Sequence, residues 1–282
     1  MALTINTNVS SIIAQRNLNN ATNALNTSIE RMTTGFKINH AKDNAADYSI
    51  SKLWNTQLSS LDVAADNASM GNDMLTTAEE TYTLLTGHLQ RVRDLTEQAA
   101  NGTYGGDSLA AINAEITARL QEFDRIAANA EFNGVKLMTG AITADVKLQV
   151  GLYADVNSQI ALDKGLFAKT TVKDLLGKEI TAMATACSTT TTAPAELTNL
   201  DTAIKTLSTR ATNIGAAQNR IESAIEAIGV QSQNLTSSLS TLRDTDVAEE
   251  SSNYIKAQIL QQASATLLST ANQLPSIALN LI

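Results

Sequence analysis

The sequence offers few side chains whose type and spacing could carry out chemistry. Cys187 is the one cysteine, which excludes an intramolecular disulfide, and the two histidines, His40 and His88, give little material for a metal site. The acids Glu79–Glu80 and Glu249–Glu250 are adjacent in sequence, so on a helix they point to different sides and make poor acid–base pairs. No HExxH, GxSxG, GxxxxGKS/T or CxxC pattern occurs. We therefore predict no catalytic, cofactor-binding or metal-binding residues, and a protein that is not an enzyme.

The charge balance argues against two classes of partner. The 282 residues contain 20 basic and 28 acidic side chains, a net charge of -8, which does not suit binding to nucleic acid or to an anionic membrane surface. No apolar run approaches the roughly 20 residues of a membrane-spanning helix, and the first residues lack the layout of a cleavable signal peptide. We expect no membrane insertion and no export by the general secretory route, so the cytosol is the default location unless a dedicated exporter recognises the chain.

Long helices are the main structural prediction. Only two prolines occur, Pro194 and Pro275, and aromatic residues make up 4% of the chain, a composition that favours uninterrupted helices packed through small side chains. Apolar residues recur at alternating spacings of three and four in the segments 10–34, 44–100, 108–127, 194–242 and 246–275. A helix over 44–100 would be about 85 Å long. We expect Gly35 to end the first helix and Pro275 to end the last.

The middle of the chain follows other patterns. Between Phe132 and Leu162, apolar residues alternate with polar residues and glycines, which indicates short strands. Residues 181–193 are small and polar, and we interpret them as an exposed Thr-rich loop in which Cys187 is a tolerated free thiol. The predicted fold class is mainly α: a long antiparallel helical bundle or coiled coil with a small β-hairpin region at the centre of the chain.

This layout divides the chain into five segments. Residues 1–43 and 244–282 are expected to form an inner terminal helical domain, because helices at both ends of the chain must fold back side by side. Residues 44–180, with the β region, and the helix 194–243 are expected to form a core helical domain. The variable loop 181–193 lies between the two parts of this core domain.

The two terminal segments are weakly patterned. The first is predicted to pack through Ala14, Leu18, Ala21, Leu25, Ser28 and Met32, and the last through Tyr254, Gln258, Gln261, Ala265, Leu268 and Asn272. A single pair of helices with these mixed seams would bury too little apolar surface to offset the entropy lost on ordering. We infer that the chain ends need partners, and that these are other copies of the same chain.

Several long motifs, in order along the chain, resemble the bacterial flagellin family. They include Ala14-Gln15-Arg16-Asn17-Leu18, Thr34-Gly35-Phe36-Lys37-Ile38-Asn39, Gln90-Arg91-Val92-Arg93-Asp94-Leu95, Phe132-Asn133-Gly134, Asn219-Arg220-Ile221-Glu222 and Ala271-Asn272-Gln273-Leu274-Pro275. The resemblance covers the chain except for about residues 177–193. The chain is therefore identified as a member of this family, in a minimal form without large outer domains.

The resemblance implies a function and a set of partners. The chain would be a structural subunit that polymerises into the helical flagellar filament for swimming motility, with filament cap and junction proteins at the filament ends. An export chaperone and the flagellar type III export apparatus would deliver it to an extracellular location, and its terminal segments would order only on assembly. The alternative is a flagellar hook–filament junction protein, which has similar ends, but the N-terminal motifs and the tail 271–275 favour flagellin. A flagellin with a central metalloprotease is excluded by the short central segment without HExxH.

The resemblance also implies two kinds of site. By motif, Arg91, Leu95 and Glu115 correspond to the positions through which the host flagellin-detecting Toll-like receptor recognises flagellins, although arginines on a long helix also serve ordinary ion pairs or subunit contacts. Flagellins often carry O-linked sugars on exposed central segments, which makes a run of four threonines the candidate glycosylation site. These are Thr189, Thr190, Thr191 and Thr192.

Overall fold

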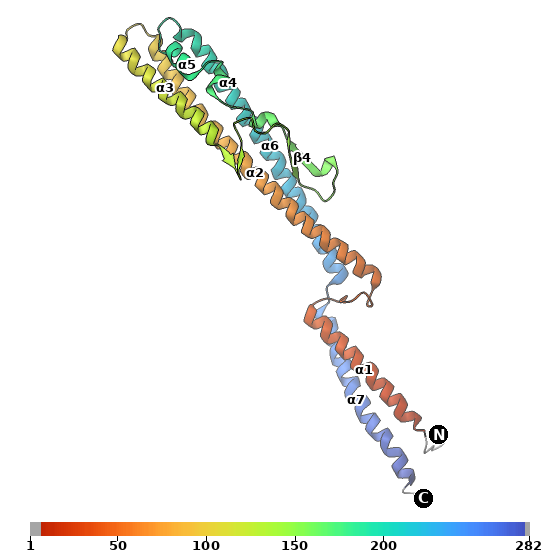
Figure 1. Ribbon diagram of the computed structural model, residues 1–282. Coiled ribbons are helices and arrows are strands. Elements are labelled where there is room, and N and C mark those ends of the chain that lie inside the picture. Colours follow the sequence, from red (N-terminus) through yellow and green to blue (C-terminus); the bar gives the residue numbers. More distant parts are fainter. Residues whose placement is uncertain (1–6, 280–282) are drawn as a thin grey trace. The chain divides into compact units, whose positions relative to one another are not determined.

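The computed structural model describes the backbone of residues 7–279 and the side chains of residues 7–273. It is mainly α, as predicted, with long antiparallel helices and two small pairs of strands in the middle of the chain (Figure 1). The helices are α1 (Val9–Thr34), α2 (Ala45–Ala100), α3 (Gly106–Asn129), α4 (Val172–Leu176), α5 (Ile180–Cys187), α6 (Ala193–Arg243) and α7 (Val247–Leu279). The strands are β1 (Glu131–Phe132), β2 (Val135–Lys136), β3 (Val146–Gln149) and β4 (Gln159–Leu162).

The chain forms two compact units. Unit 1 consists of residues 1–58 and 233–282, and unit 2 of residues 59–232. Their boundaries fall inside α2 and α6, whereas the sequence placed them at the interhelical turns near residues 43 and 243. A heptad pattern that runs through a whole helix gives no local signal of where one packing environment replaces another.

Unit 2 contains the large hydrophobic core. The apolar heptad positions of α2 from Leu61 to Val92 are buried, whereas Ile50 and Leu53 near its start are exposed. α3 contributes Ile112, Ile116, Leu120, Phe123 and Ala127 to the core of unit 2. Tyr82 is fully buried, and its hydroxyl donates a 2.8 Å hydrogen bond to the carbonyl oxygen of Leu166. This bond satisfies the one polar atom that the ring carries into the core.

The strands are held on this helical core by turns and by one close approach. Asn133 and Gly134 both have positive φ (48° and 79°), as a two-residue turn between β1 and β2 requires. β3 pairs with β4 in antiparallel register, with Leu148 opposite Ile160. Leu148 lies directly over Gly71 of α2, where an added Cβ would be 2.3 Å from its Cδ1. The missing side chain at position 71 therefore allows the hairpin to approach the helix. Two 3₁₀ helices, η1 (Val156–Ser158) and η2 (Lys164–Phe167), flank β4.

Residues 181–193 are not the loop that the sequence predicted. α5 covers Ile180–Cys187, and its residues Met183, Ala184 and Cys187 are buried in the core of unit 2, where α5 packs on α3. Three alanines in this stretch are strong helix formers, and the apolar positions 183, 184 and 187 have helical spacing. The Thr-rich composition concealed this short helix, and only residues 188–192 form a turn.

Unit 1 is built on the antiparallel pair α1–α7, whose chain ends lie at the same end of the pair (Figure 1). Gly35 ends α1 in the left-handed conformation (φ 75°), as predicted. At the start of α2, the Asn44 side chain accepts hydrogen bonds from the backbone amides of Ala46 and Asp47. At the start of α7, the Asp246 side chain accepts hydrogen bonds from the backbone amides of Ala248 and Glu249.

A short clasp joins the chain leaving α1 to the chain entering α7. Lys37 N donates to Arg243 O at 2.8 Å, and Thr245 N donates to Gly35 O at 2.9 Å. The guanidinium of Arg243 lies 4.0 Å above the Phe36 ring centroid. The segments 35–37 and 243–245, which follow and precede the paired helices, are therefore fixed to each other.

Two predictions about α7 were wrong. The helix does not end at Pro275 but continues to Leu279. Half of its predicted seam is displaced: Ala257, Ser264 and Ala271 are buried, one position away from the predicted Gln258, Ala265 and Asn272, which are exposed. The other predicted positions, Tyr254, Gln261 and Leu268, are half-buried, and Gln261 contacts Thr22 of α1. Small side chains allow α1 and α7 to approach closely, whereas the longer amides gain more by staying in water.

Candidate self-association and recognition surfaces

The described residues contain no arrangement that indicates catalysis or metal binding. Among residues 7–273, no group of three or more His, Cys, Asp or Glu side chains could hold a metal ion. None of the helices in the described part of the chain has both the length and the hydropathy needed to cross a membrane. The features that point to function are surfaces, and the first of them is on the terminal helices.

The seam between α1 and α7 is built from very small side chains. Each of its buried positions is less than 9% exposed: Ala14, Ala21 and Ser28 on α1, and Ala257, Ser264 and Ala271 on α7. Leu18 and Leu25, which were predicted for this seam, are only half-buried, and Met32 is exposed. Alanine and serine bury little apolar area, so this interface contributes little hydrophobic free energy per turn of helix.

Polar contacts cross the same seam at intervals. Asn8 Nδ2 donates to the carbonyl oxygen of Ala271 at 2.6 Å, and Ser11 Oγ donates to Asn272 Oδ1 at 2.7 Å. Further along the pair, Gln261 Nε2 donates to Thr22 Oγ1 at 3.2 Å. Arg31 and Glu250 form an ion pair at 3.6 Å, in which the Glu250 side chain is 8% exposed.

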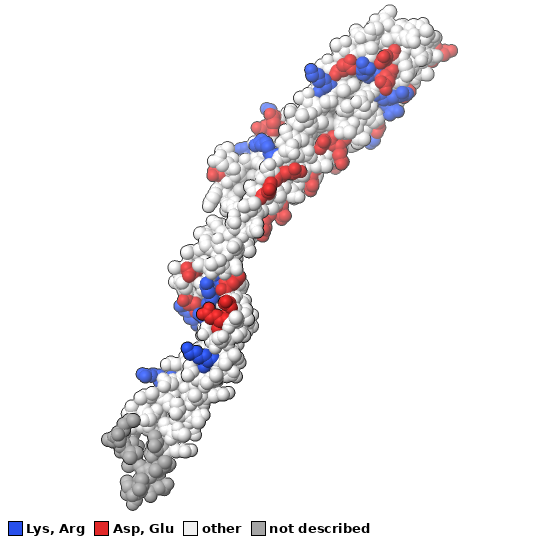
Figure 2. Space-filling model, turned by 180° about the vertical axis from the view of Figure 1, so that it is seen from behind, with Lys and Arg blue, Asp and Glu red and all other residues white. Residues whose placement is uncertain are grey.

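The large apolar side chains of this pair face outward instead of into the seam. Ten of them are between 39% and 62% exposed: Val9, Ile12, Ile13, Ile29, Met32, Val247, Ile255, Ile259, Leu260 and Leu267. Charged residues are scarce beside them, since Arg16 is the one charge in 9–29 and Lys256 the one charge in 251–279. Figure 2 shows mostly uncharged surface next to the grey terminal residues. Exposed apolar surface on this scale marks an interaction site.

A groove of about 420 Å³ lies between the two helices on this apolar surface. It is lined by Ser10, Ile13, Ala14, Asn17, Leu267, Thr270 and Ala271. Because the seam side chains are so short, the flanking Ile13 and Leu267 form the walls of the groove and Ala14 and Ala271 its floor. An apolar side chain from another helix fits the chemistry of such a groove.

The three residues of the recognition motif lie in two different environments. Arg91 of α2 and Glu115 of α3 are partly exposed and form an ion pair, with Nε 2.9 Å from Oε1. The hydrogen bond to Glu115 raises the pKa of Arg91. Leu95 is 2% exposed and belongs to the core of unit 2. The expectation that all three side chains form a contact surface is therefore corrected for Leu95, which can only support the helix beneath the ion pair.

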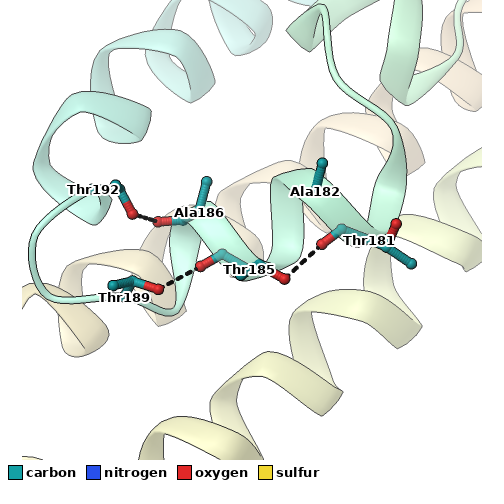
Figure 3. Close-up of a pocket in the computed structure, with 6 residues that line it drawn as sticks. All are labelled: Thr181, Ala182, Thr185, Ala186, Thr189 and Thr192. Carbon is teal, nitrogen blue, oxygen red and sulfur yellow. Dashed lines mark hydrogen bonds between the residues drawn. The ribbon is translucent and has the colours of Figure 1, made fainter.

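The threonine run is less open than a mobile loop would be. Thr189 Oγ1 donates to Thr185 O at 2.8 Å, and Thr192 Oγ1 donates to Ala186 O at 2.6 Å (Figure 3). These residues line a shallow depression of about 510 Å³ together with Thr181 and Thr185. Thr191 is exposed and Thr190 half-buried, and neither hydroxyl has a hydrogen-bond partner in the described part of the chain.

Cys187 lies beside an ion pair in which Glu196 is buried and Lys178 is partly exposed. Its side chain is fully buried, and burial raises the pKa of the thiol to about 11. The nearby Glu196 is 4% exposed; burial disfavours its ionised form, but hydrogen bonds from Lys178 and Asn199 outweigh that effect and lower the pKa of its carboxyl. A tolerated thiol on an exposed loop was thus the wrong interpretation of Cys187, which is a core residue.

Sequence reasoning missed the outward apolar faces and the contact between Asn8 and Ala271. A signal for the faces was present, because Ile12–Ile13 and Ile259–Leu260 are apolar pairs that no single heptad seam can bury. A signal for the contact was present in Pro275, which has no amide hydrogen for the carbonyl oxygen four residues earlier.

Two families of known sequences match the chain, at its two ends. They are the bacterial flagellin N-terminal helical region, over residues 5–143, and the bacterial flagellin C-terminal helical region, over residues 197–282. Between the two matches lie residues 144–196, which include β3, β4, α4 and α5.

Two relatives match this chain over nearly their whole extent. The flagellar filament 33 kDa core protein of Treponema phagedenis is 31% identical, over 99% of this chain and 99% of the relative. Polar flagellin F of Vibrio parahaemolyticus is also 31% identical, over 100% of both chains. The alignment with polar flagellin F covers 377 positions, so that relative contains residues that this chain lacks.

One solved structure is informative for the fold. It is the structure assigned to a flagellar hook-associated protein of Vibrio parahaemolyticus, with a TM-score of 0.61, 12% identity, and coverage of 72% of this chain and 100% of that chain. At this identity the likeness shows the fold alone, so it gives no support to the hook–filament junction alternative.

The burial of Cys187 gives a prediction for thiol labelling. With a pKa of about 11, about one thiol in a thousand is ionised at pH 8, and the core also keeps reagents away. We expect iodoacetamide at pH 8 to leave the folded protein unlabelled over a time in which the urea-unfolded protein is fully labelled, as measured by mass spectrometry. Labelling should rise as the pH approaches the thiol pKa. Equal rates for folded and unfolded protein at pH 8 would contradict this.

Proposed function

This chain belongs to the bacterial flagellin family, and we propose that its copies assemble through the outward apolar faces of α1 and α7. The protein is a structural subunit of the flagellar filament. The observation that carries the assembly proposal is the inverted packing of the terminal pair, which has alanine and serine inside and isoleucine, leucine and valine outside. A helix that is apolar on more than one side is stable when it is covered on more than one side.

The energetics of the pair point the same way. Ordering a residue costs about 1–2 kcal/mol in backbone entropy. The apolar area that a seam of alanines and serines buries offsets little of this cost. Burying the outward side chains would add about 1.5–3 kcal/mol for each one that becomes fully covered. The terminal helices therefore gain most of their stability from neighbouring copies, and we expect them to become fully ordered on assembly.

A polar substitution on the outward face should weaken assembly without weakening the free subunit. We expect Ile259→Gln and Leu267→Gln each to raise the critical concentration for polymerisation about tenfold, because each loses roughly 1–2 kcal/mol of apolar burial. Sedimentation of filaments grown from short seeds measures the critical concentration.

The matched control is Val156→Gln, which changes an exposed apolar side chain of η1 in unit 2. It should leave the critical concentration nearly unchanged, and all three variants should keep the unfolding midpoint of the free subunit. Wild-type assembly by the two α7 variants would rule out this face as the interface.

A second proposal concerns recognition by the host flagellin-detecting Toll-like receptor. It is supported by the motif and by the exposed Arg91–Glu115 pair, which offers a hydrogen-bonding patch on rigid helices. We expect Arg91→Ala and Glu115→Ala each to lower receptor activation about tenfold in a reporter-cell assay. Both variants should unfold at the same urea concentration as the wild-type protein.

Two further variants separate recognition from folding. Arg125→Ala breaks an ion pair with Glu122 within α3 and should leave activation unchanged. Leu95→Ala should destabilise unit 2 by roughly 2–4 kcal/mol, because it opens a cavity in the core. Full activation by the Arg91 variant would contradict the proposal.

A third proposal covers location and modification. We propose that an export chaperone and the flagellar type III apparatus deliver the chain to the outside of the cell, where cap and junction proteins bound the filament, and that sugars are attached within Thr189–Thr192. Thr191 is the best acceptor in this run, because its side chain is exposed and its hydroxyl makes no hydrogen bond within the described residues. Flagellin relatives over the whole chain support the extracellular location.

Intact mass spectrometry of subunits sheared from the cell surface tests this proposal. We expect a mass above that of the sequence by whole sugar units, which peptide mapping places in 189–192. A surface-derived subunit with the sequence mass would contradict the glycosylation, and absence of the protein from the sheared fraction of flagellated cells would contradict the location.

A further inference from the structure

The seam between α1 and α7 does not determine its own register. Six of its buried residues repeat every seven positions, at 14, 21 and 28 on α1 and at 257, 264 and 271 on α7, and these six are alanine or serine. Glu250, seven positions before Ala257, is also buried and pairs with Arg31 at the end of the seam nearest the clasp. A slip of one heptad would place the same kinds of side chain opposite each other. Apolar packing therefore distinguishes the registers weakly, and polar contacts must select one of them.

One of these polar contacts replaces a hydrogen bond that is missing within α7. Pro275 lies inside the helix and has no amide hydrogen, so the carbonyl of Ala271 cannot accept the usual bond from the residue four positions later. Asn8 donates to this same carbonyl oxygen through Nδ2, at 2.6 Å. The helix thus carries one carbonyl, at a fixed position, that needs a donor from outside the helix.

Asn8 is also the N-cap of α1. Its Oδ1 accepts a hydrogen bond from the backbone amide of Ser11 at 3.1 Å, while its Nδ2 donates one to the carbonyl oxygen of Ala271. The first turn of α1 and the proline-containing turn of α7 are therefore tied by one side chain, through two bonds that use both ends of its amide. A slip of one heptad would break the contact with Ala271, because the neighbouring seam carbonyl at position 264 has an ordinary residue, Leu268, four positions later.

We propose that Asn8 is the positioning residue that holds α1 in register on α7 at the end of the pair opposite the clasp and the Arg31–Glu250 ion pair, and that Pro275 creates the acceptor that Asn8 recognises. Correct register brings Ile13 and Leu267 together along one groove. This inference rests on the proposed function, because the register matters most where the outward faces of the pair meet other copies of the chain.

A double-mutant cycle tests the coupling. Asn8→Ser keeps an N-cap acceptor but is too short to reach Ala271, and Pro275→Ala restores the amide within α7. We expect Asn8→Ser to raise the critical concentration for filament growth about fivefold, as for the loss of one hydrogen bond to a part-buried carbonyl. In the Pro275→Ala background the same substitution should raise it less than twofold.

The control is Ser11→Ala, which removes the neighbouring contact to Asn272. Because that contact does not involve the Ala271 carbonyl, its effect should be the same in both backgrounds. An Asn8→Ser effect that is absent, or equal in the two backgrounds, overturns the proposal. The proposal is also overturned if Pro275→Ala reduces the effects of Asn8→Ser and Ser11→Ala equally, because that result would reflect only a more stable α7 helix.

A second readout separates this proposal from the proposed function. If the wild-type chain forms no filaments, the proposed function fails, and the cycle is then measured by amide hydrogen exchange of α1 in the soluble chain. Asn8→Ser should there speed exchange of the α1 amides several-fold in the wild-type background and not with Pro275→Ala. The same exchange in all four chains overturns the register proposal.

Discussion

The rest of unit 1 depends on how closely α1 and α7 approach each other. Alanine and serine at 14, 21, 28, 257, 264 and 271 allow that approach, and the same small side chains deprive the pair of a hydrophobic core. The larger apolar residues have no space between the two helices and are turned outward, where Arg16 is the one charge in 9–29 and Lys256 the one charge in 251–279. The close pairing of the helices and their apolar outer surface thus have one cause. Small side chains lie between the helices, and large apolar side chains lie on the sides that face away from the seam.

Unit 2 is organised in the opposite way. Its helices bury leucines, isoleucines and rings such as Tyr82 and Phe123 between them, so its stability comes from within the chain. Leu95, Cys187 and the Lys178–Glu196 pair belong to this self-sufficient core or to its edge. A subunit with one self-supporting part and one part completed by neighbours can be folded before assembly and still gain its final contacts from it.

The sequence predicted the long helices well, because period and caps act locally. The buried heptads of α2, the left-handed Gly35 and the cap at Asp246 all follow from residues within a few positions of each other. Prediction from the sequence failed where contacts between distant parts of the chain decide the structure. The segment 181–193 as a whole looks small and polar, but α3 offers an apolar surface to Met183 and Cys187 of α5. Half of the predicted α7 seam was displaced by one residue, because close packing favours Ala257 over its neighbour Gln258. Pro275 lies within a helix because Asn8, from the other end of the chain, supplies the missing donor. The self-association function followed from the weak terminal seams, whereas the buried position of Leu95 could not be read from its motif.

The clasp at Phe36 and Arg243 has a topological consequence. By joining the two linkers, it turns everything between residues 37 and 243 into a closed loop whose ends are already together. The entropy of closing a loop grows only with the logarithm of its length, by about 0.6 kcal/mol for each doubling. The middle of such a chain can therefore be lengthened or shortened over evolution at small expense to the paired ends. A longer relative such as polar flagellin F, whose alignment with this chain covers 377 positions, is compatible with this low entropic cost.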